Sequence, residues 1–268
     1  MSTPPPTGLL TSPQNPYVKA LVELRKDGEL RRAEQRFLIE GKRAVAAALA
    51  QNRTPVLELV YSENVLGSDL DLVEQARAKN IRLVPVTKDV FKKIADTMEP
   101  QGIAAVVKLP EWTLAQVLGE KEPLLAVADG LQDPGNLGTL IRSCEAAGAA
   151  GLITLEGTAD PFNAKVVRST AAALLTFPIV RMKRAEFIAA AQKNKIQLVA
   201  TVARDGTPYK KFDWSKRPLA LCVGSEGDGL HTDLEKACNA RVSIPMRGES
   251  ESLNAAVAAS ILLFEALG

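Results

Sequence analysis

The stretch LLAVADGLQDPGNLGTLIR, residues 124–142, decides how the fold is interpreted. Its first residues, Leu124–Asp129, form a short apolar run typical of a buried strand. A loop rich in Gly, Asp and Pro follows, and the chain then enters a helix that carries Arg142 in its first turns. In open α/β sheets, ligands bind beyond the carboxyl ends of strands and helix N-termini attract anions. Asn136 and Arg142 are therefore candidates to contact a phosphate or ribose, although a tight turn with a solvated arginine fits the spacing equally well.

The same alternation of strand and helix continues through the C-terminal half. The expected strands are Leu124–Asp129, Gly151–Leu155, Ile196–Thr201, Leu219–Gly224 and Arg241–Ile244; the expected helices lie near Gly138–Ala147, Ala164–Ala173, Arg184–Asn194, Leu230–Cys238 and Leu253–Leu267, the last with Ser252 as its N-cap. The strands lack strict polar alternation, which indicates burial on both faces. We therefore expect a parallel sheet with helices on both sides over residues 123–268.

The N-terminal half indicates a smaller α/β domain over residues 13–108. Helical patterns from Pro13 and over Gly41–Gln51 precede alternating elements, expected at Val56–Tyr61, Asp69–Lys79, Ile81–Val86, Lys88–Ala95 and Ile103–Val107. Residues 1–12 contain three consecutive prolines and no apolar periodicity, so a disordered arm is expected there. Residues 109–122 contain Pro110 and Gly119 and are interpreted as a linker.

Composition limits the class of protein. The chain has 268 residues, 46% hydrophobic and 24% charged, with three cysteines and a net charge of +2. That charge is small for a protein that only coats nucleic acid, so an RNA partner would need a local basic patch. The best candidate is residues 17–53, with nine Lys/Arg against five Asp/Glu, although a solvated helix face is the commoner explanation. The odd cysteine count, the lack of a signal sequence and the lack of a long apolar run predict a cytoplasmic protein without a membrane segment.

Two further loops follow predicted strands. In LALCVGSEGDGL, residues 219–230, three glycines surround Glu226, and glycine lets backbone groups approach a ligand closely. In VSIPMRGESESLNA, residues 242–255, a strand, a Pro245 turn and a Ser-Leu-Asn helix start follow one another. Each is a weak signal when taken singly, because glycine-rich turns are common and a serine such as Ser252 is more often a cap than a catalyst. Asn254, in the first turn of that helix, could cap it or hydrogen-bond a ligand.

Taken together and in order, the three loops resemble the three motifs of the SpoU family of RNA methyltransferases, within the SPOUT superfamily. The matching elements are Asn136, Gly138 and Arg142, then Gly224-Ser-Glu-Gly-Asp-Gly229, then Ile244-Pro-Met246 with Ser252-Leu-Asn254. The segment from Asn163 to Thr170 also resembles an intermediate family segment that contains Arg168. It departs from that segment with Thr170 in place of Ser and Ala172 in place of a common Gly.

The resemblance implies an RNA 2′-O-ribose methyltransferase that uses S-adenosylmethionine, with a deep trefoil knot in the C-terminal domain and a homodimeric assembly. The implied cofactor-binding residues are Gly224, Ile244, Leu253 and Thr201; Arg168 and Ser252 are implied to contact substrate. Arg142 is implied to reach the site from the adjoining subunit or its edge. The N-terminal half resembles the substrate-binding domain of rRNA-directed members, itself similar to a ribosomal protein of the α/β/α type, so ribosomal RNA is favoured over tRNA.

The implied catalytic residues are Arg142, Asn136, Glu226 and Asn254. Methyl transfer requires an in-line ribose oxygen that loses its proton. Because a guanidinium is hard to deprotonate, we expect Arg142 to orient phosphate and stabilise the developing alkoxide rather than to act as base. The other three residues are expected to position the ribose and loops. The base is not identified, His231 lies outside the motifs, and no spacing of Cys, His or carboxylates predicts a metal.

Two alternatives from other classes stay open. The first is a non-catalytic RNA-binding protein on the same fold, against which the presence of all four catalytic candidates argues. The second is a nucleotide-dependent oxidoreductase, which would need a Gly-x-Gly-x-x-Gly fingerprint after an early strand; the chain lacks it.

Overall fold

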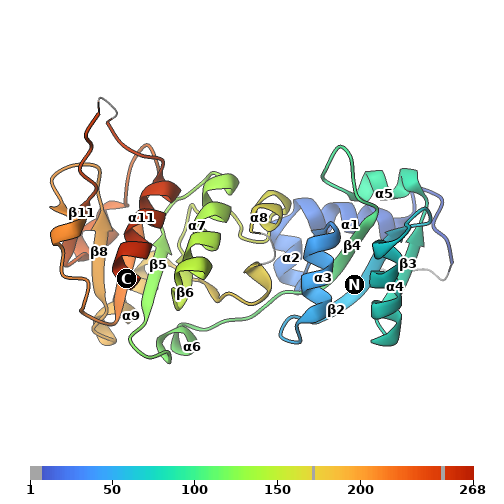
Figure 1. The fold of residues 1–268 in the computed structure, drawn as a ribbon, viewed down its shortest axis with the longest axis horizontal. Coiled ribbons are helices and arrows are strands. Elements are labelled where there is room, and N and C mark those ends of the chain that lie inside the picture. Colours follow the sequence, from blue (N-terminus) through green and yellow to red (C-terminus); the bar gives the residue numbers. More distant parts are fainter. Residues whose placement is uncertain (1–7, 171–172, 249–250) are drawn as a thin grey trace. The chain divides into compact units, whose positions relative to one another are not determined.

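The structure is a computed structural model that describes residues 8–170, 173–248 and 251–268. Contacts divide the chain into two compact units (Figure 1). The N-terminal unit comprises residues 1–110 and 162–176, and the C-terminal unit comprises residues 111–161 and 177–268. The main division falls close to the expected one. Residues 162–176, expected inside the C-terminal domain, instead belong to the N-terminal unit.

The reason for this difference is packing within the N-terminal unit. The Phe162 ring lies 4.9 Å from that of Phe37, between ring centroids, and the Thr54 hydroxyl donates to the Leu175 carbonyl at 2.6 Å. Helix α8, Ala164–Ser169, contacts β1, Arg36–Glu40. Part of the helix expected over residues 164–173, at 171–172, lies outside the described residues.

The N-terminal unit is built on a four-stranded sheet with the order β1-β4-β2-β3. Strand β4 is antiparallel to both β1 and β2, and β2 is parallel to β3. The remaining strands are β2 (Val56–Ser62), β3 (Arg82–Val86) and β4 (Ile103–Lys108), and the helices are α1 (Pro16–Lys26), α2 (Gly28–Glu34), α3 (Lys42–Ala50), α4 (Ser68–Ala78) and α5 (Lys88–Ile94). These directions bring the carboxyl ends of β1, β2 and β3 and the amino end of β4 to one edge, where α3, α4 and α5 begin.

The stretch expected as a disordered arm lies partly outside the described residues, which begin at Gly8. In the remainder, Leu10 is buried and forms a parallel bridge with Val86. Its amide donates to the Pro85 carbonyl at 3.0 Å, and its carbonyl accepts from Thr87 at 2.9 Å. The end of the arm is therefore ordered, because an apolar side chain and a backbone pairing hold it to β3.

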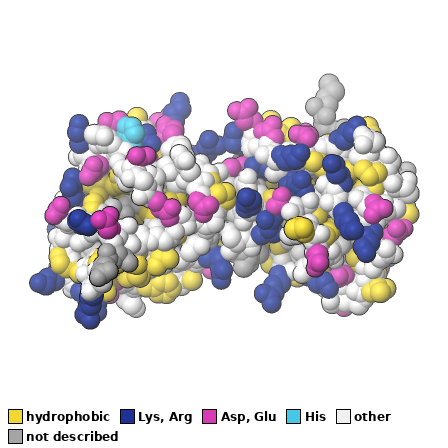
Figure 2. Space-filling view, turned by 90° about the horizontal axis from the view of Figure 1, so that it is seen from above, with side chains coloured by type: hydrophobic (Ala, Val, Ile, Leu, Met, Phe, Trp, Pro, Cys, Tyr) yellow, Lys and Arg dark blue, Asp and Glu magenta, His cyan; other side chains and the backbone are white. Residues whose placement is uncertain are grey.

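The basic stretch 17–53 contributes less free charge than its composition suggests. Arg31 is buried and donates to the carbonyls of Leu24 and Arg25, at 2.8 and 2.7 Å. Arg25 donates to the Ile94 carbonyl at 2.8 Å, and Arg36 pairs with Glu34. These three guanidinium groups satisfy backbone or carboxylate partners inside the unit. Phosphate contacts therefore depend on other cations, which are visible as dark-blue side chains over the N-terminal unit in Figure 2.

The C-terminal unit contains a seven-stranded sheet with the order β7-β6-β5-β10-β8-β11-β9, in which every described pair is parallel. Its strands are β5 (Leu124–Ala128), β6 (Gly151–Thr154), β7 (Ile179–Arg181), β8 (Gln197–Thr201), β9 (Thr207–Pro208), β10 (Leu219–Val223) and β11 (Ala240–Ser243), and its helices are α6 (Leu114–Leu118), α7 (Pro134–Ala147), α9 (Arg184–Lys193), α10 (Thr232–Ala237) and α11 (Ala255–Leu267). The parallel α/β prediction is confirmed. The short strands β1, β7 and β9 were not expected.

The sheet of this unit is covered by helices. Phe187 of α9 and Leu234 of α10 pack in one core cluster with Leu125, Val127 and Ala220 of the sheet. Helices α7 and α11 pack on each other and contact β6 and β10, in front of the sheet in Figure 1. The stretch expected as a linker forms α6, whose Val117 is buried in the same cluster.

Candidate active site

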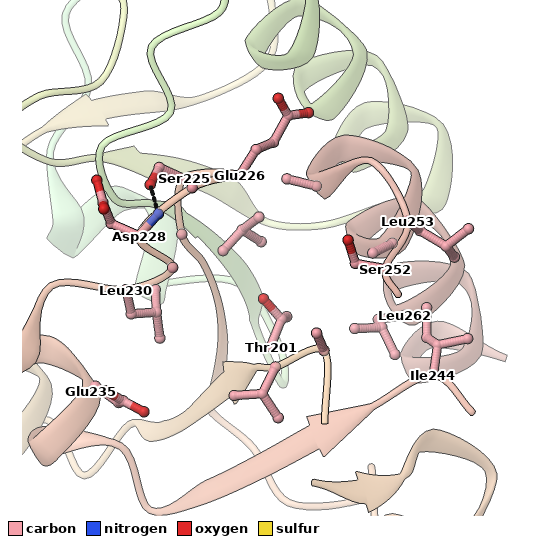
Figure 3. A pocket seen from close by; sticks show the side chains of 18 of the residues that line it. Thr201, Ser225, Glu226, Asp228, Leu230, Glu235, Ile244, Ser252, Leu253 and Leu262 are labelled. Atoms are coloured by element: carbon pink, nitrogen blue, oxygen red, sulfur yellow. Dashed lines mark hydrogen bonds between the residues drawn. The ribbon is translucent and has the colours of Figure 1, made fainter. Parts of the chain in front are cut away.

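A pocket of about 350 Å³ lies in the C-terminal unit, beyond the carboxyl ends of β8, β10 and β11 and beside α11 (Figure 3). This is the edge at which a parallel sheet binds ligands. Six predicted site residues line it: Thr201, Gly224, Glu226, Ile244, Ser252 and Leu253. The sequence interpretation missed the apolar residues Leu230 and Leu262, whose side chains extend into the pocket, and the carboxylate of Glu235. Leu262 stands two turns beyond Asn254, so helical periodicity alone could have indicated it.

The loop after β10 is held tightly folded. Ser225 and Gly229 exchange backbone hydrogen bonds of 3.0 and 3.1 Å, and the Ser225 hydroxyl accepts from the Asp228 amide at 3.1 Å. A Cβ placed on Gly224 would lie 2.1 Å from the Gly229 carbonyl carbon and 2.3 Å from the Leu230 nitrogen. Gly224 is therefore required by backbone packing within the loop itself. Its expected role was to admit a ligand, and the structure supplies this different reason for glycine.

Three predicted catalytic residues form one hydrogen-bonded cluster. The Asn136 side-chain amide donates to Glu226 Oε1 at 2.8 Å, and the Asn254 amide donates to the same oxygen at 2.6 Å. Asn254 also donates to the Asn136 side-chain oxygen at 2.9 Å. Figure 3 shows the Glu226 carboxylate directed away from the pocket interior, toward α7. The cluster joins the starts of α7 and α11 to the glycine loop, and it leaves one carboxylate charge and amide groups beside the pocket.

Asn254 also begins α11. Its side-chain oxygen accepts from the amides of Ala256 and Val257 at 3.1 and 3.2 Å, so Asn254 is the N-cap. The expected cap, Ser252, was wrong by two residues. Asn is as good an N-cap as Ser, and here its nitrogen is free to bond Glu226 while its oxygen caps the helix.

A buried ion pair that the sequence did not indicate supports the glycine loop. Asp129, 2% exposed at the end of β5, accepts from Arg184 Nε and Nη2 at 2.9 and 2.7 Å. Its other oxygen accepts from the His231 amide at 2.8 Å. A carboxylate that closes a buried strand requires such partners, because an unpaired buried charge is very costly. Asp129 thereby joins β5, α9 and the end of the glycine loop.

The other predicted residues lie elsewhere. Arg142 is exposed on α7 and makes no ion pair within the described part of the chain. Its offset of six residues from Asn136 turns it about 120° around the helix. Arg168 belongs to the N-terminal unit, where it pairs with Asp96. His231 is the N-cap of α10, accepting from Asp233.

Among the residues the structure describes, no group of three His, Cys, Asp or Glu side chains is placed to hold a metal ion. In the same ranges, no helix is long and apolar enough to span a membrane.

Comparison with known proteins identifies the family of this site. The model of the SpoU rRNA methylase family matches residues 123–264, and that of an MRM3-like substrate-binding domain matches residues 15–105. The chain belongs to the SpoU rRNA methylase family. The prediction made from the three loops is confirmed, and so is the enzyme class, an RNA 2′-O-methyltransferase.

Relatives of the family resemble the chain along most of its length. A Bacillus subtilis protein named 23S rRNA (guanosine(2553)-2′-O)-methyltransferase is 34% identical, over 97% of this chain and 99% of its own. A Streptomyces viridochromogenes protein named 23S rRNA (uridine(2479)-2′-O)-methyltransferase is 32% identical, over 86% of this chain and 82% of its own. The AdoMet-bound rRNA methyltransferase of Sinorhizobium meliloti has a TM-score of 0.86, 30% identity and 97% coverage of both chains.

Proposed function

We propose that this protein transfers a methyl group from S-adenosylmethionine to a ribose 2′-oxygen of ribosomal RNA. The observation that carries the proposal is the pocket bounded by the second and third motif loops, with Asn136 of the first motif joined to Glu226 and Asn254 beside it. Relatives named as rRNA 2′-O-methyltransferases, and a neighbour solved with AdoMet bound, support it.

The charges of the pocket favour this cofactor over a dinucleotide. Among the described residues that line it are three with carboxylates, Glu226, Asp228 and Glu235, and no Lys, Arg or His; the Glu226 carboxylate points away from the pocket interior. Such a lining attracts a cationic ligand and repels a diphosphate, so it argues against the oxidoreductase alternative. Apolar side chains of Leu230, Ile244 and Leu262 supply surface for a nucleobase. When bound, S-adenosylmethionine supplies an electrophilic methyl group.

The residues of this chain then have separate tasks. The cluster of Asn136, Glu226 and Asn254 holds the loops and orients the ribose, with Ser252 at the pocket wall as a substrate contact. Arg142 contacts phosphate and stabilises charge on the 2′-oxygen as its proton leaves. Arg168 is proposed as a second RNA contact, from the N-terminal unit.

We further propose that the protein is a homodimer in which Arg142 serves the site of the adjoining subunit. The exposed large apolar residues of α11 are Val257, Phe264 and Leu267, which recur at helical spacing on one face. Such a stripe on an otherwise packed helix indicates a covered surface. A second copy is the occupant we propose because α11 packs against α7, the helix that carries Arg142.

The substrate class is proposed from the family and the N-terminal unit. Both named relatives act on 23S rRNA, one at a guanosine and one at a uridine, so the family does not dictate the base. The trefoil knot and the cytoplasmic location stay predictions.

Calorimetry and mass spectrometry test the proposal together. The protein should bind S-adenosylmethionine and not NAD, and rRNA from cells lacking the gene should lose one ribose methylation while tRNA is unchanged. RNA binding without S-adenosylmethionine binding would instead support the non-catalytic alternative. Loss of a tRNA methylation would instead show that the substrate is tRNA.

A further inference from the structure

A second pocket lies wholly within the N-terminal unit, at the edge where β1, β2 and β3 end and β4 begins. Its volume is about 810 Å³, and its lining includes the first turns of α3, α4 and α5 and the loops before α4 and β4. Figure 1 shows α5 and the loop before β4 at the same end of this sheet. None of its lining residues belongs to the site described above.

Two buried polar atoms of this pocket, Ser62 Oγ and Asp69 Oδ1, lack hydrogen-bond partners, and the second of them is in an ion pair. Ser62, the last residue of β2, is 4% exposed, and its hydroxyl has no partner. Asp69 is 5% exposed; its Oδ1 lies 3.0 Å from the Lys42 ammonium, but outside hydrogen-bond geometry. Buried polar groups are ordinarily hydrogen-bonded, and leaving one unpaired is costly. Both groups line the pocket, so a ligand with donor groups would satisfy them.

The rim of the pocket is cationic. Lys42, Lys88 and Lys92 line it, against the carboxylates of Asp69 and Glu99. Helices α3 and α4 begin after Gly41 and Gly67, neither of which provides a side-chain cap. The Lys42 amide of α3 donates to Gln101 Oε1 at 2.9 Å, and the Asp69 and Leu70 amides of α4 donate to the carbonyls of Leu66 and Gly67 at 3.4 and 3.0 Å. An anion at this edge would therefore be held mainly by the lysine side chains.

The pocket is held in shape by backbone hydrogen bonds across its floor. The Ser62 amide donates to the Gly102 carbonyl at 2.8 Å, and the Gly41 amide donates to the Ile103 carbonyl at 3.0 Å. Met98 stands at the rim with its side chain almost fully exposed. A preformed cavity with polar atoms at its base and an apolar side chain at its mouth suits a flat, polar-edged ligand.

We propose that this pocket binds one unpaired nucleotide of the RNA substrate. Its phosphate lies against Lys88 and Lys92, and its base edge donates to the Asp69 carboxylate and bonds the Ser62 hydroxyl. A stacked base inside a duplex cannot reach such recessed atoms, whereas a base splayed from a loop or bulge can. The inference rests on the proposed function and adds to it the structural class of RNA that is recognised.

The lysines are tested with the full-length protein and an unmodified 23S rRNA transcript. K88A/K92A should weaken binding at least tenfold and lower the slope of log affinity against log salt by about 1.5 to 2, because two phosphate contacts are lost. The matched control, K26A/K108A, removes two exposed lysines of the same unit that do not line the pocket. Equal losses in the two variants would overturn the proposal.

Ser62→Ala separates ligand binding from folding. Because the hydroxyl has no partner in the free protein, its removal should leave the melting temperature unchanged or higher, while RNA affinity falls threefold to tenfold. The methylation rate at saturating RNA should match wild type, with only KM raised. If the wild-type enzyme is active but RNA affinity is unchanged in both S62A and K88A/K92A, the proposal that this pocket binds a nucleotide is refuted and the proposed function is not. A wild-type protein that methylates no rRNA would instead refute the proposed function.

Discussion

Gly224 is a residue of the pocket at which the backbone leaves no room for a side chain. Its missing Cβ is what allows the Gly229 backbone to close the loop, at distances no real Cβ could accept. We expect Gly224→Ala to weaken S-adenosylmethionine binding at least tenfold and to lower the melting temperature by several degrees. Gly227→Ala is the matched control, because a Cβ there meets nothing within 4 Å. Calorimetry and thermal unfolding of both variants decide the matter, and equal effects would show that loop closure is not the cause.

Substitutions of Arg142, again at the scale of one residue, test whether it positions the substrate or acts as the general base. Arg142→Ala should abolish methyl transfer and spare cofactor binding, since Arg142 does not line the pocket. Arg142→Lys keeps the charge but loses the planar fork and releases its proton more easily. A positioning role predicts a rate defect of constant size as pH rises toward about 10, where an ordinary lysine loses its proton. A rescue of the lysine variant at alkaline pH would show that the residue acts as base.

At the scale of elements, Asn254 links the start of α11 to the start of α7 and to the glycine loop after β10. Asn254→Ala removes both the helix cap and the bonds to Asn136 and Glu226, so it should cost about 1 kcal/mol of stability and most of the activity. Asn254→Asp keeps an oxygen that caps the helix but places a second carboxylate against Glu226. We expect it to retain near wild-type stability and lose activity. Denaturant unfolding and methylation rates separate the two, and an active Asp variant would show that only the cap matters.

At the scale of the whole molecule, the apolar stripe on α11 predicts how copies associate. Phe264 is 54% exposed, and Phe264→Glu should shift the protein from dimer to monomer and abolish methylation. Leu70→Glu, at an exposed apolar residue of α4 in the N-terminal unit, is the control and should stay dimeric. Light scattering measures the mass of each.

Mixing two inactive proteins tests whether Arg142 crosses between subunits. Arg142→Ala retains a working pocket, and Ile244→Trp fills its pocket but retains Arg142. After subunit exchange, half the dimers carry one complete site, so activity should return to about a quarter of wild type. No recovery would place Arg142 in its own subunit's site.

The sequence by itself determined five of the seven C-terminal strands and the loops that follow them, but not the short strands β7 and β9. Those features are local, because continuous apolar runs and Gly or Pro breaks act over a few neighbouring residues. The order of the three loops was enough to identify the family and to nominate the pocket residues. The N-cap of α11 could not be predicted in this way. Asn254 caps the helix instead of Ser252, and its side chain is also held by a hydrogen bond to Glu226, a residue distant in sequence.

Only the tertiary structure decided which of these residues meet. Asn136 bonds Glu226 across 90 residues of sequence and Asn254 across 118, and Asp129 receives the His231 amide across 102. The sequence also could not show that Arg25 and Arg31 bond backbone carbonyls inside the N-terminal unit, or that residues 162–176 belong to that unit. Local sequence patterns do not predict these long-range contacts. Such a contact stabilises the fold only after the order of the strands has brought the two chain segments together.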